Sequence, residues 1–154
     1  MVTTFQNFLL TTNKSKIKYR LLDNFCLEEV EIKNKHIVDF CFGKNKFRKI
    51  KFFNCTFNTD IRYKDSELNG LEFEKCKVIG AMKFYRCTFS KVRFDSVKLA
   101  GKKIIIRQTE PYDLDDVTFM SLGNMIVSNK LKIDKNVFCD EWLKTALKEK
   151  FNLD

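Results

Sequence analysis

The stretch CTFSKVRFDS (residues 87–96) repeats one five-residue pattern twice, and this pattern decides the fold. A small or apolar residue (Cys87, Val92) stands two positions before a phenylalanine (Phe89, Phe94), and the other positions are polar. Outward from this stretch, a large apolar residue recurs at five-residue spacing along most of the chain. The series is Leu22, Leu27, Ile32, Ile37, Phe42, Phe47, Phe52 and Phe57, then Tyr63, Leu68, Phe73 and Val78, then Phe84, Phe89, Phe94 and Leu99.

A five-residue period matches neither the 3.6-residue period of a helix nor the two-residue period of a strand. It predicts a chain that turns a corner every five residues and stacks on itself, with four units in each coil. One extra residue precedes Tyr63 and another precedes Phe84, so later coils are 21 residues long, as from Phe52 to Phe73. The predicted stacks are Phe42, Tyr63 and Phe84; Phe52, Phe73 and Phe94; and Phe57, Val78 and Leu99.

Charged residues at outward positions support this register. Equivalent positions on successive coils alternate in sign: Glu31, Lys51, Glu72 and Arg93. The same register places Glu28 beneath Arg48 and Glu29 beneath Lys49. Because stacked strands lie ~4.8 Å apart, opposite charges in register attract each other. Each exposed pair contributes only about 0.2–1 kcal/mol, so these pairs indicate register rather than stability.

The units resemble those of the pentapeptide-repeat family over residues 22–99. The family repeat is a small residue, a polar one, a central Leu or Phe and two polar ones; CTFNT (residues 55–59) matches it, as do both units of residues 87–96. The resemblance implies an all-β fold, a right-handed quadrilateral β-helix. Departures from the pattern predict a widened first coil: bulky Phe25, Phe40 and Met82, and polar Lys35 and Asn45.

The length and the 44% apolar content predict a single domain over residues 1–154. Residues 1–20, with Phe5 and Phe8, are expected to cap one end, and residues 21–106 to form the coils. Residues 107–135 are expected to form an irregular last coil and a loop. The pairs Val117 with Phe119 and Leu131 with Ile133 are assigned to this coil, Gly123-Asn124 to a turn, and Ile104-Ile105-Ile106 to a strand of ambiguous register.

A helix is expected within the C-terminal segment, residues 136–154. It spans about Asp140 to Phe151, because Trp142, Leu143, Ala146, Leu147 and Phe151 form an apolar face at helical spacing. Two roles fit this face: capping the last coil, or forming a homodimer or partner interface. The chain is therefore expected to be a monomer, or a homodimer through this helix.

Catalytic and cofactor motifs are absent from the sequence. A pair of His36 with Cys26 or Cys41 would lack an orienting group and an oxyanion site. Asp115-Asp116 has no histidine or further carboxylate cluster to complete a metal site, and no phosphate-binding loop is present. These observations predict a protein that is not an enzyme and has no cofactor or metal.

Targeting features and cysteine spacing indicate a cytoplasmic protein. Met1 to Leu10 does not match a signal peptide, and no stretch is long and apolar enough for a membrane span. The six cysteines form no CxxC pair, so free buried thiols are expected.

Net charge is the main indication of function. Lys and Arg number 29 against 20 Asp and Glu, a formal charge of +9. One predicted face gathers basic residues and a tyrosine, with Asp65 as the acidic exception: Lys44, Arg62, Lys64, Lys83, Tyr85 and Arg86. This face is either a solubilising surface or a docking site for an acidic protein or a phosphate backbone.

Three functions are consistent with the sequence. The pentapeptide-repeat family includes proteins that protect DNA gyrase by imitating DNA, but imitation requires an acidic surface and this chain is basic. Nucleic-acid binding is less favoured because outward aromatic residues are sparse, with Phe53 and Tyr85 the clear cases. The favoured function is a non-catalytic module that binds one acidic protein, such as a bacterial immunity protein that neutralises a toxin.

Overall fold

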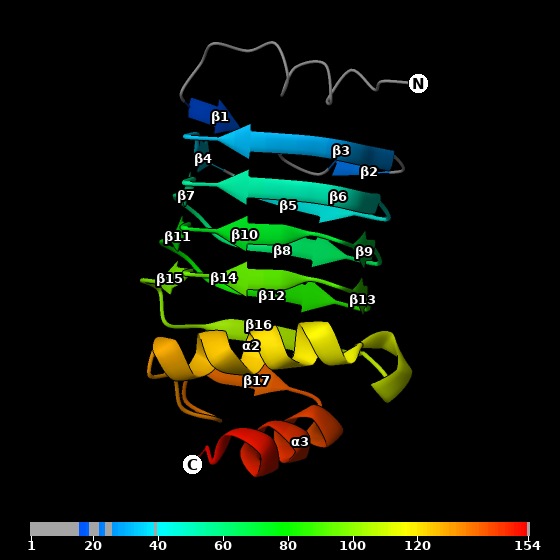
Figure 1. Cartoon of the computed structure of the whole chain (residues 1–154), viewed down its shortest axis with the longest axis vertical. Helices are drawn as coiled ribbons and strands as arrows, with labels where there is room; N and C mark the ends of the chain where they lie inside the picture. The colour runs from blue at the N-terminus through cyan, green and yellow to red at the C-terminus, as the bar shows by residue number, and fades with distance from the viewer. Residues whose placement is uncertain (1–15, 19–21, 24–25, 39, 154) are drawn as a thin grey trace.

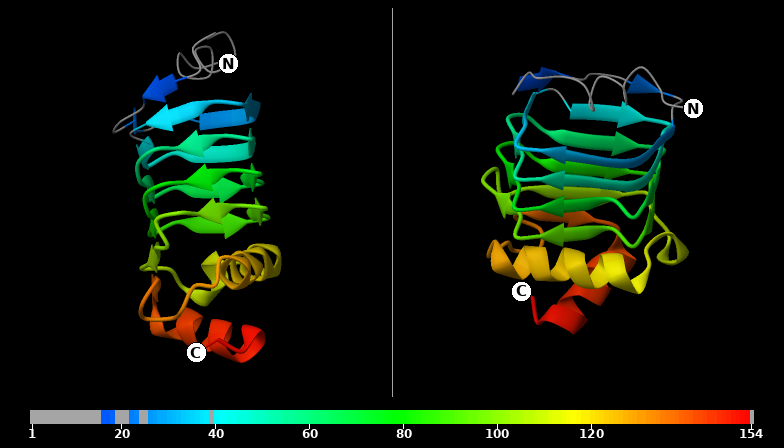
Figure 2. Two further views of the ribbon diagram at one scale, coloured as in Figure 1. Left: turned by 90° about the vertical axis from the view of Figure 1, so that its left-hand side faces the viewer. Right: turned by 45° about the horizontal axis from the view of Figure 1, so that its top comes forward.

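The computed structural model describes residues 16–18, 22–23, 26–38 and 40–153. Over these residues the chain forms a β-solenoid of stacked coils, with two helices at the end opposite β1 (Figures 1 and 2). The predicted N-terminal cap lies outside the described residues except for β1 (Lys16–Lys18). The predicted all-β solenoid with a helical cap is confirmed.

Three parallel sheets form the four walls of the coils. The first sheet contains β1, β4 (His36–Val38), β7 (Thr56–Phe57), β11 (Lys77–Val78) and β15 (Lys98–Leu99). The second contains β2 (Leu22–Asp23), β5 (Phe40–Gly43), β8 (Ile61–Lys64), β12 (Met82–Tyr85), β16 (Ile104–Arg107) and β17 (Val137–Cys139). The third contains β3 (Cys26–Lys33), β6 (Lys46–Phe53), β9 (Glu67–Asn69), β10 (Glu72–Glu74), β13 (Thr88–Ser90) and β14 (Arg93–Asp95). It covers two walls, because β3 and β6 continue through a corner that separates β9 from β10 and β13 from β14.

At three of the four corners of the coil, a residue in the left-handed conformation stands two positions after the large apolar residue. Lys44, Asp65 and Arg86 form one such corner column, with φ of 51°, 52° and 51°. None of the non-glycine residues with positive φ in the described chain is β-branched, in line with the steric cost of that conformation for branched side chains. The five-residue period thus corresponds to one turn per unit.

The corner that follows β7, β11 and β15 holds the extra residues of the longer coils. Gly80 is required there, because a Cβ atom would lie 2.7 Å from the backbone N of Asp60. A Cβ on Gly101 would lie 2.3 Å from the carbonyl oxygen of Gly80. Close backbone stacking therefore keeps side chains out of this corner.

Aromatic rings form continuous stacks inside the coil. Phe73 lies between Phe52 and Phe94, with ring centroids 5.3 and 5.8 Å away and interplanar angles of 11° and 9°. Tyr63 stacks on Phe84 at 5.6 Å and 4°. These stacks, and the register of Glu31, Lys51, Glu72 and Arg93, are confirmed. The predicted pairing of Glu28 with Arg48 and the ion pair of Glu29 with Lys49 are also present.

The predicted strand at residues 104–106 is β16, and its register is now defined. Ile106 pairs with Phe84, while Ile104 pairs with Met82, so both isoleucines point inward and are buried. Ile105 lies at an outward position beside Lys83. Among the described residues, this is the one wall that continues beyond the fourth coil in named strands, first through β16 and then through β17 stacked on it.

The expectation of a coil and a turn at Val117, Phe119 and Gly123-Asn124 is wrong. These residues belong to helix α2 (Asp116–Ser128), which follows the short 3₁₀ helix η1 (Pro111–Asp113). Asp115 caps α2 by accepting a hydrogen bond from the Thr118 N–H at 3.0 Å. The helix buries residues at helical spacing: Thr118, Leu122, Gly123, Met125 and Ile126. The spacing of Val117 and Phe119, with one residue between them, resembles that of an inward pair in a strand. The buried residues of the whole segment follow the longer period of a helix, and that period decides the structure.

The predicted C-terminal helix is confirmed as α3 (Glu141–Phe151), with Asp140 at its N-cap. Residues 137–139 lie in β17 and not in the helix, because they continue the parallel ladder from β16. Leu131 and Ile133 are buried as predicted.

Helix α2, rather than α3, covers the exposed edge of the last coil. Its polar side chains accept hydrogen bonds from backbone N–H groups that a further strand would otherwise satisfy. The pairs are Lys91 N with Asp115 Oδ2 (2.8 Å), Val92 N with Thr118 Oγ1 (3.1 Å), Phe94 N with Ser121 Oγ (2.7 Å) and Leu99 N with Asn129 Oδ1 (2.8 Å). The helix thus replaces the missing coil with side-chain acceptors.

Candidate binding surface

The second sheet carries the basic residues predicted from the sequence. Arg62 and Lys83 are neighbours in register, and Lys64 is the neighbour of Tyr85. Lys44 and Arg86 lie at the corner that ends the same strands. Because parallel strands lie ~4.8 Å apart, these side chains form a closely spaced group. The structure therefore brings all six predicted residues to one wall and its corner.

Two cations of this group have acidic partners. Lys83 Nζ lies 2.8 Å from Asp60 Oδ2. Arg86 binds Asp65 through two hydrogen bonds, from Nε at 2.6 Å and from Nη2 at 3.1 Å. This two-point contact fixes the guanidinium and reduces its availability to a partner.

The carboxylates respond to these contacts. The Arg86 hydrogen bond lowers the pKa of Asp65, and the charges of Lys64 and Lys44 add to that effect. Burial raises the pKa of Asp60, but hydrogen bonds from Lys83 and from the Ala81 N–H outweigh burial and leave it below its usual value. Both carboxylates are therefore charged at neutral pH.

Three cations of the group lack a salt bridge to any described residue: Lys44, Arg62 and Lys64. Lys44 and Arg62 are exposed, and Lys64 is half-buried. The Arg62 guanidinium lies over the Tyr85 ring, 5.7 Å from its centroid. This cation–π contact fixes both side chains outside the coil.

The same wall continues onto β16 and β17 with residues that the sequence did not reveal. Arg107 is the next residue in register after Tyr85, and its Nη1 donates to the Cys139 carbonyl at 3.1 Å. Lys103 Nζ lies 5.6 Å from the centroid of the Phe138 ring, which is next to Ile105 in register. If Ile104 and Ile106 point inward, Arg107 follows at an outward position beside Tyr85. This placement could not be predicted because the register of residues 100–135 was ambiguous in the sequence.

We name this surface the basic face. Its cations are Lys44, Arg62, Lys64, Lys83, Arg86, Lys103 and Arg107. Its acidic residues are Asp60, Asp65 and Asp23, which lies on β2 in the register column of Lys64 and Tyr85. Three apolar or aromatic side chains lie among them: Tyr85, Ile105 and Phe138.

The Cys–His pairs considered from the sequence are not formed. His36 lies on β4, whereas Cys26 lies on β3 and Cys41 on β5, in two other sheets. Asp115 caps α2, and Asp116 is exposed in its first turn. In the described part of the chain, no group of three or more His, Cys, Asp or Glu residues could hold a metal ion.

Four described cysteines are buried with free thiols, and Cys26 is exposed. Cys76 Sγ donates to the Phe52 carbonyl at 3.3 Å, and Cys87 Sγ to the Tyr63 carbonyl at 3.5 Å. Burial raises the pKa of Cys87 to about 12 and that of Cys139 to about 11. These thiols are protonated at neutral pH and pack between coils.

No protein-family model, curated protein or solved structure matches the chain. None of the helices in the described residues is long and apolar enough to span a membrane. The described residues fold as a β-solenoid with a cap of two helices.

Proposed function

We propose that this protein is a non-catalytic binding module whose basic face docks onto an acidic surface of one partner protein. The observation that carries the proposal is the excess of seven cations over three acidic residues on one wall. The wall is built on the hydrogen-bonded ladder of the second sheet, so little ordering is required when a partner binds. Charges of one sign on such a surface increase the rate of association with an acidic partner.

A protein partner fits this face better than a nucleic acid. Base stacking needs open aromatic rings, but Arg62 lies over Tyr85 and Lys103 over Phe138. On the third sheet, Lys51 and Lys75 lie over Phe53 in the same way. Ile105 and Phe138 instead supply the apolar contact area that protein interfaces use between polar rims.

We also propose membership of the pentapeptide-repeat family. The support is the match of the five-residue sequence period to one corner per unit, with a left-handed residue at three of the four corners, as at Lys44, Asp65 and Arg86. Gyrase protection by DNA imitation is disfavoured because the face that gathers charge is positive. A small, rigid binding protein of this kind fits best the role of a cytoplasmic immunity protein, which would neutralise an acidic toxin by binding it.

The proposal is tested by affinity capture from the native host with mass spectrometry. The variant Arg62→Glu/Lys64→Glu should lose the captured protein, because it reverses two cations without acidic partners. The control Lys77→Glu/Lys132→Glu makes the same change in net charge at exposed residues on other surfaces. It should retain the partner.

Two results would overturn the proposal. One is recovery of nucleic acid without a protein partner. The other is equal loss of the captured protein in the control, which would show that net charge alone, and not this face, determines capture. Unchanged circular dichroism of both variants confirms that the fold is intact.

A further inference from the structure

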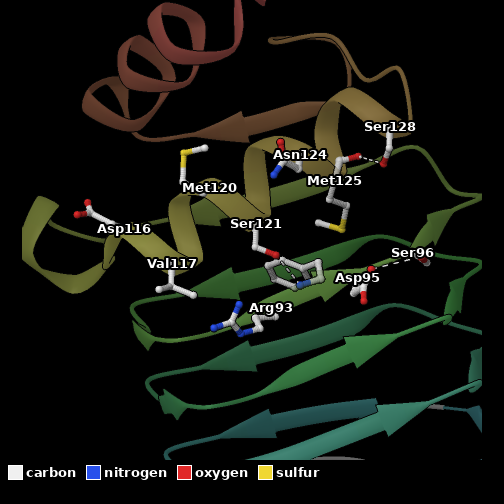
Figure 3. A pocket seen from close by; sticks show the side chains of 11 residues that line it. Arg93, Asp95, Ser96, Asp116, Val117, Met120, Ser121, Asn124, Met125 and Ser128 are labelled. Atoms are coloured by element: carbon white, nitrogen blue, oxygen red, sulfur yellow. Dashed lines mark hydrogen bonds between the residues drawn. The ribbon is translucent and has the colours of Figure 1, made fainter.

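An open groove lies along the seam between α2 and the last coil, on a different wall from the basic face (Figure 3). Its volume is about 720 Å³. Phe94, Val117, Met120 and Met125 supply its apolar lining. Its polar lining includes Ser121 and three charged residues, Arg93, Asp95 and Asp116. Met120 is 38% exposed, although Met125 is buried. Figure 3 shows Val117 pointing from α2 toward the coil, with Arg93 opposite.

The groove continues into a second hollow that is cationic. This hollow has a volume of about 470 Å³ and shares Ser96 and Ser128 with the first. Its charged lining residues are Lys98, Lys102 and Lys130, and no acidic residue lines it. The combined groove therefore has an apolar strip with charges of both signs along α2 and is positive at the C-terminal end of the helix.

One backbone donor in the groove is open. In the corner column below it, Asn54 N donates to the Glu74 carbonyl at 3.0 Å and Lys75 N donates to the Asp95 carbonyl at 2.9 Å. Ser96 is the next residue in this column and has the same left-handed φ, 53°. Among the described residues, its N–H has no acceptor, because α2 takes the place of the coil that would supply the carbonyl.

The remaining donors beside the groove are already satisfied. Phe94 N donates to Ser121, and Leu99 N donates to Asn129, whose Nδ2 in turn donates to the Val97 carbonyl at 2.9 Å. These bonds hold α2 at a fixed distance from the coil and keep the groove formed. A ligand thus meets one free N–H, an apolar strip beside Arg93, Asp95 and Asp116, and three lysines.

We propose that this groove binds an extended peptide segment of a partner protein, with apolar side chains over Phe94 and Met120 and a carboxylate at the Lys98–Lys130 end. Charge complementarity identifies an occupant with its acidic group at one end: all three charged residues of the second hollow are lysines, whereas Asp95 and Asp116 in the first hollow repel a carboxylate there. Helix α2 has 13 residues and is ~20 Å long, which matches about six residues of extended chain. The Ser96 N–H donates to a main-chain carbonyl of the peptide, as a strand edge does in β-augmentation.

The test uses an array of acetylated hexapeptides in which two leucines and two aspartates occupy every combination of positions. A matched array carries asparagine in place of aspartate. The tightest aspartate peptide is then titrated into the ¹⁵N-labelled full chain. We expect shifts at Ser96 and along α2, slower hydrogen exchange of the Ser96 amide, and affinity at least about tenfold weaker for the asparagine peptide.

Variants separate the groove from other surfaces. Lys98→Glu/Lys130→Glu should weaken binding about tenfold or more, and Ser128→Trp should block the junction of the two hollows. Lys77→Glu, one coil away in register with Lys98, should bind normally. Arg62→Glu/Lys64→Glu on the basic face should also bind normally, so this proposal and the proposed function fail separately.

Three results would overturn the proposal: equal affinity of the aspartate and asparagine peptides, shifts confined to the basic face, or no shifts at millimolar peptide. Self-association that Ser128→Trp abolishes, without peptide binding, would assign the groove to a second copy of the chain instead. Amide spectra of the free variants confirm that each one is folded.

Discussion

The ring of Phe73 lies parallel to that of Phe52, with centroids 5.3 Å apart, because one coil of 21 residues returns the chain to the same wall. Phe57 packs against both rings edge-to-face, at centroid distances of 5.4 and 5.8 Å. Stacked rings on one wall and perpendicular rings from the next wall fill the interior of the coil. A ring in the core such as Phe73 therefore contacts a stacked ring on each face and a perpendicular ring at its side.

Phe73→Ala should reduce the free energy of unfolding by about 3–5 kcal/mol, since it removes a fully buried ring between two others. Urea denaturation followed by circular dichroism measures the change. Phe53→Ala is the matched control, because Phe53 is adjacent to Phe52 but lies outside the coil and is only half-buried. An equal loss in both variants would contradict the inward stack.

Ser121→Ala tests whether α2 supplies the hydrogen-bond acceptors that a further coil would otherwise supply. The change leaves the Phe94 N–H without its acceptor at a buried site, which costs about 1–3 kcal/mol. Hydrogen exchange of the Phe94 amide should accelerate accordingly. Ser128→Ala removes a hydroxyl from the same helix that bonds only the helix's own Met125 carbonyl, so it should leave Phe94 exchange unchanged.

The regular coils were predictable because the position of a residue within its five-residue unit determines whether it faces inward or forms a corner. Large apolar residues every five positions face inward, and at three of the four corners the residue two positions later adopts the left-handed conformation. The in-register charges, such as Glu29 with Lys49, confirm the register without any long-range information. Local periodicity therefore sufficed for the fold and for the six predicted residues of the basic face.

Helix α2 and the groove beside it were not predictable in this way. Gly123 suggested a turn, but its actual constraint comes from Phe151, 28 positions later, whose ring occupies the space of a Cβ atom. Likewise, Ser96 follows the same pattern as Lys75, and only the absence of a coil above it leaves its N–H open. Both features arise from packing between distant segments, which the repeat does not encode.

Gly123→Ala should destabilise the protein although alanine favours helices. Helix propensity alone would add about 1 kcal/mol of stability. A Cβ atom at this position would lie 2.0 Å from Cε2 of Phe151, so α3 must shift, and such overpacking costs about 1–3 kcal/mol. Thermal unfolding measures the sign.

Two further variants test the origin of that loss. Phe151→Ala combined with Gly123→Ala should remove the additional penalty, because the two side chains no longer compete for one space. Asn124→Ala, at an exposed position of the same helix, controls for propensity and should be neutral or stabilising. A stabilised Gly123→Ala variant would show that α2 and α3 do not pack as described.

The contact between Asp65 and Arg86 should make a contribution to stability that depends on pH. Because the folded-state pKa of Asp65 lies below its unfolded value of about 3.9, the contribution is complete above that value. It is lost as the pH falls through the lower folded-state pKa, where the carboxyl group becomes protonated. The side-chain carboxyl ¹³C shift of Asp65, followed from pH 7 to pH 2, should give a depressed pKa in the parent chain and a higher one in Arg86→Gln. Lys98→Gln, on another wall, should leave this pKa unchanged, and a parent value at or above about 3.9 would contradict the two-point contact.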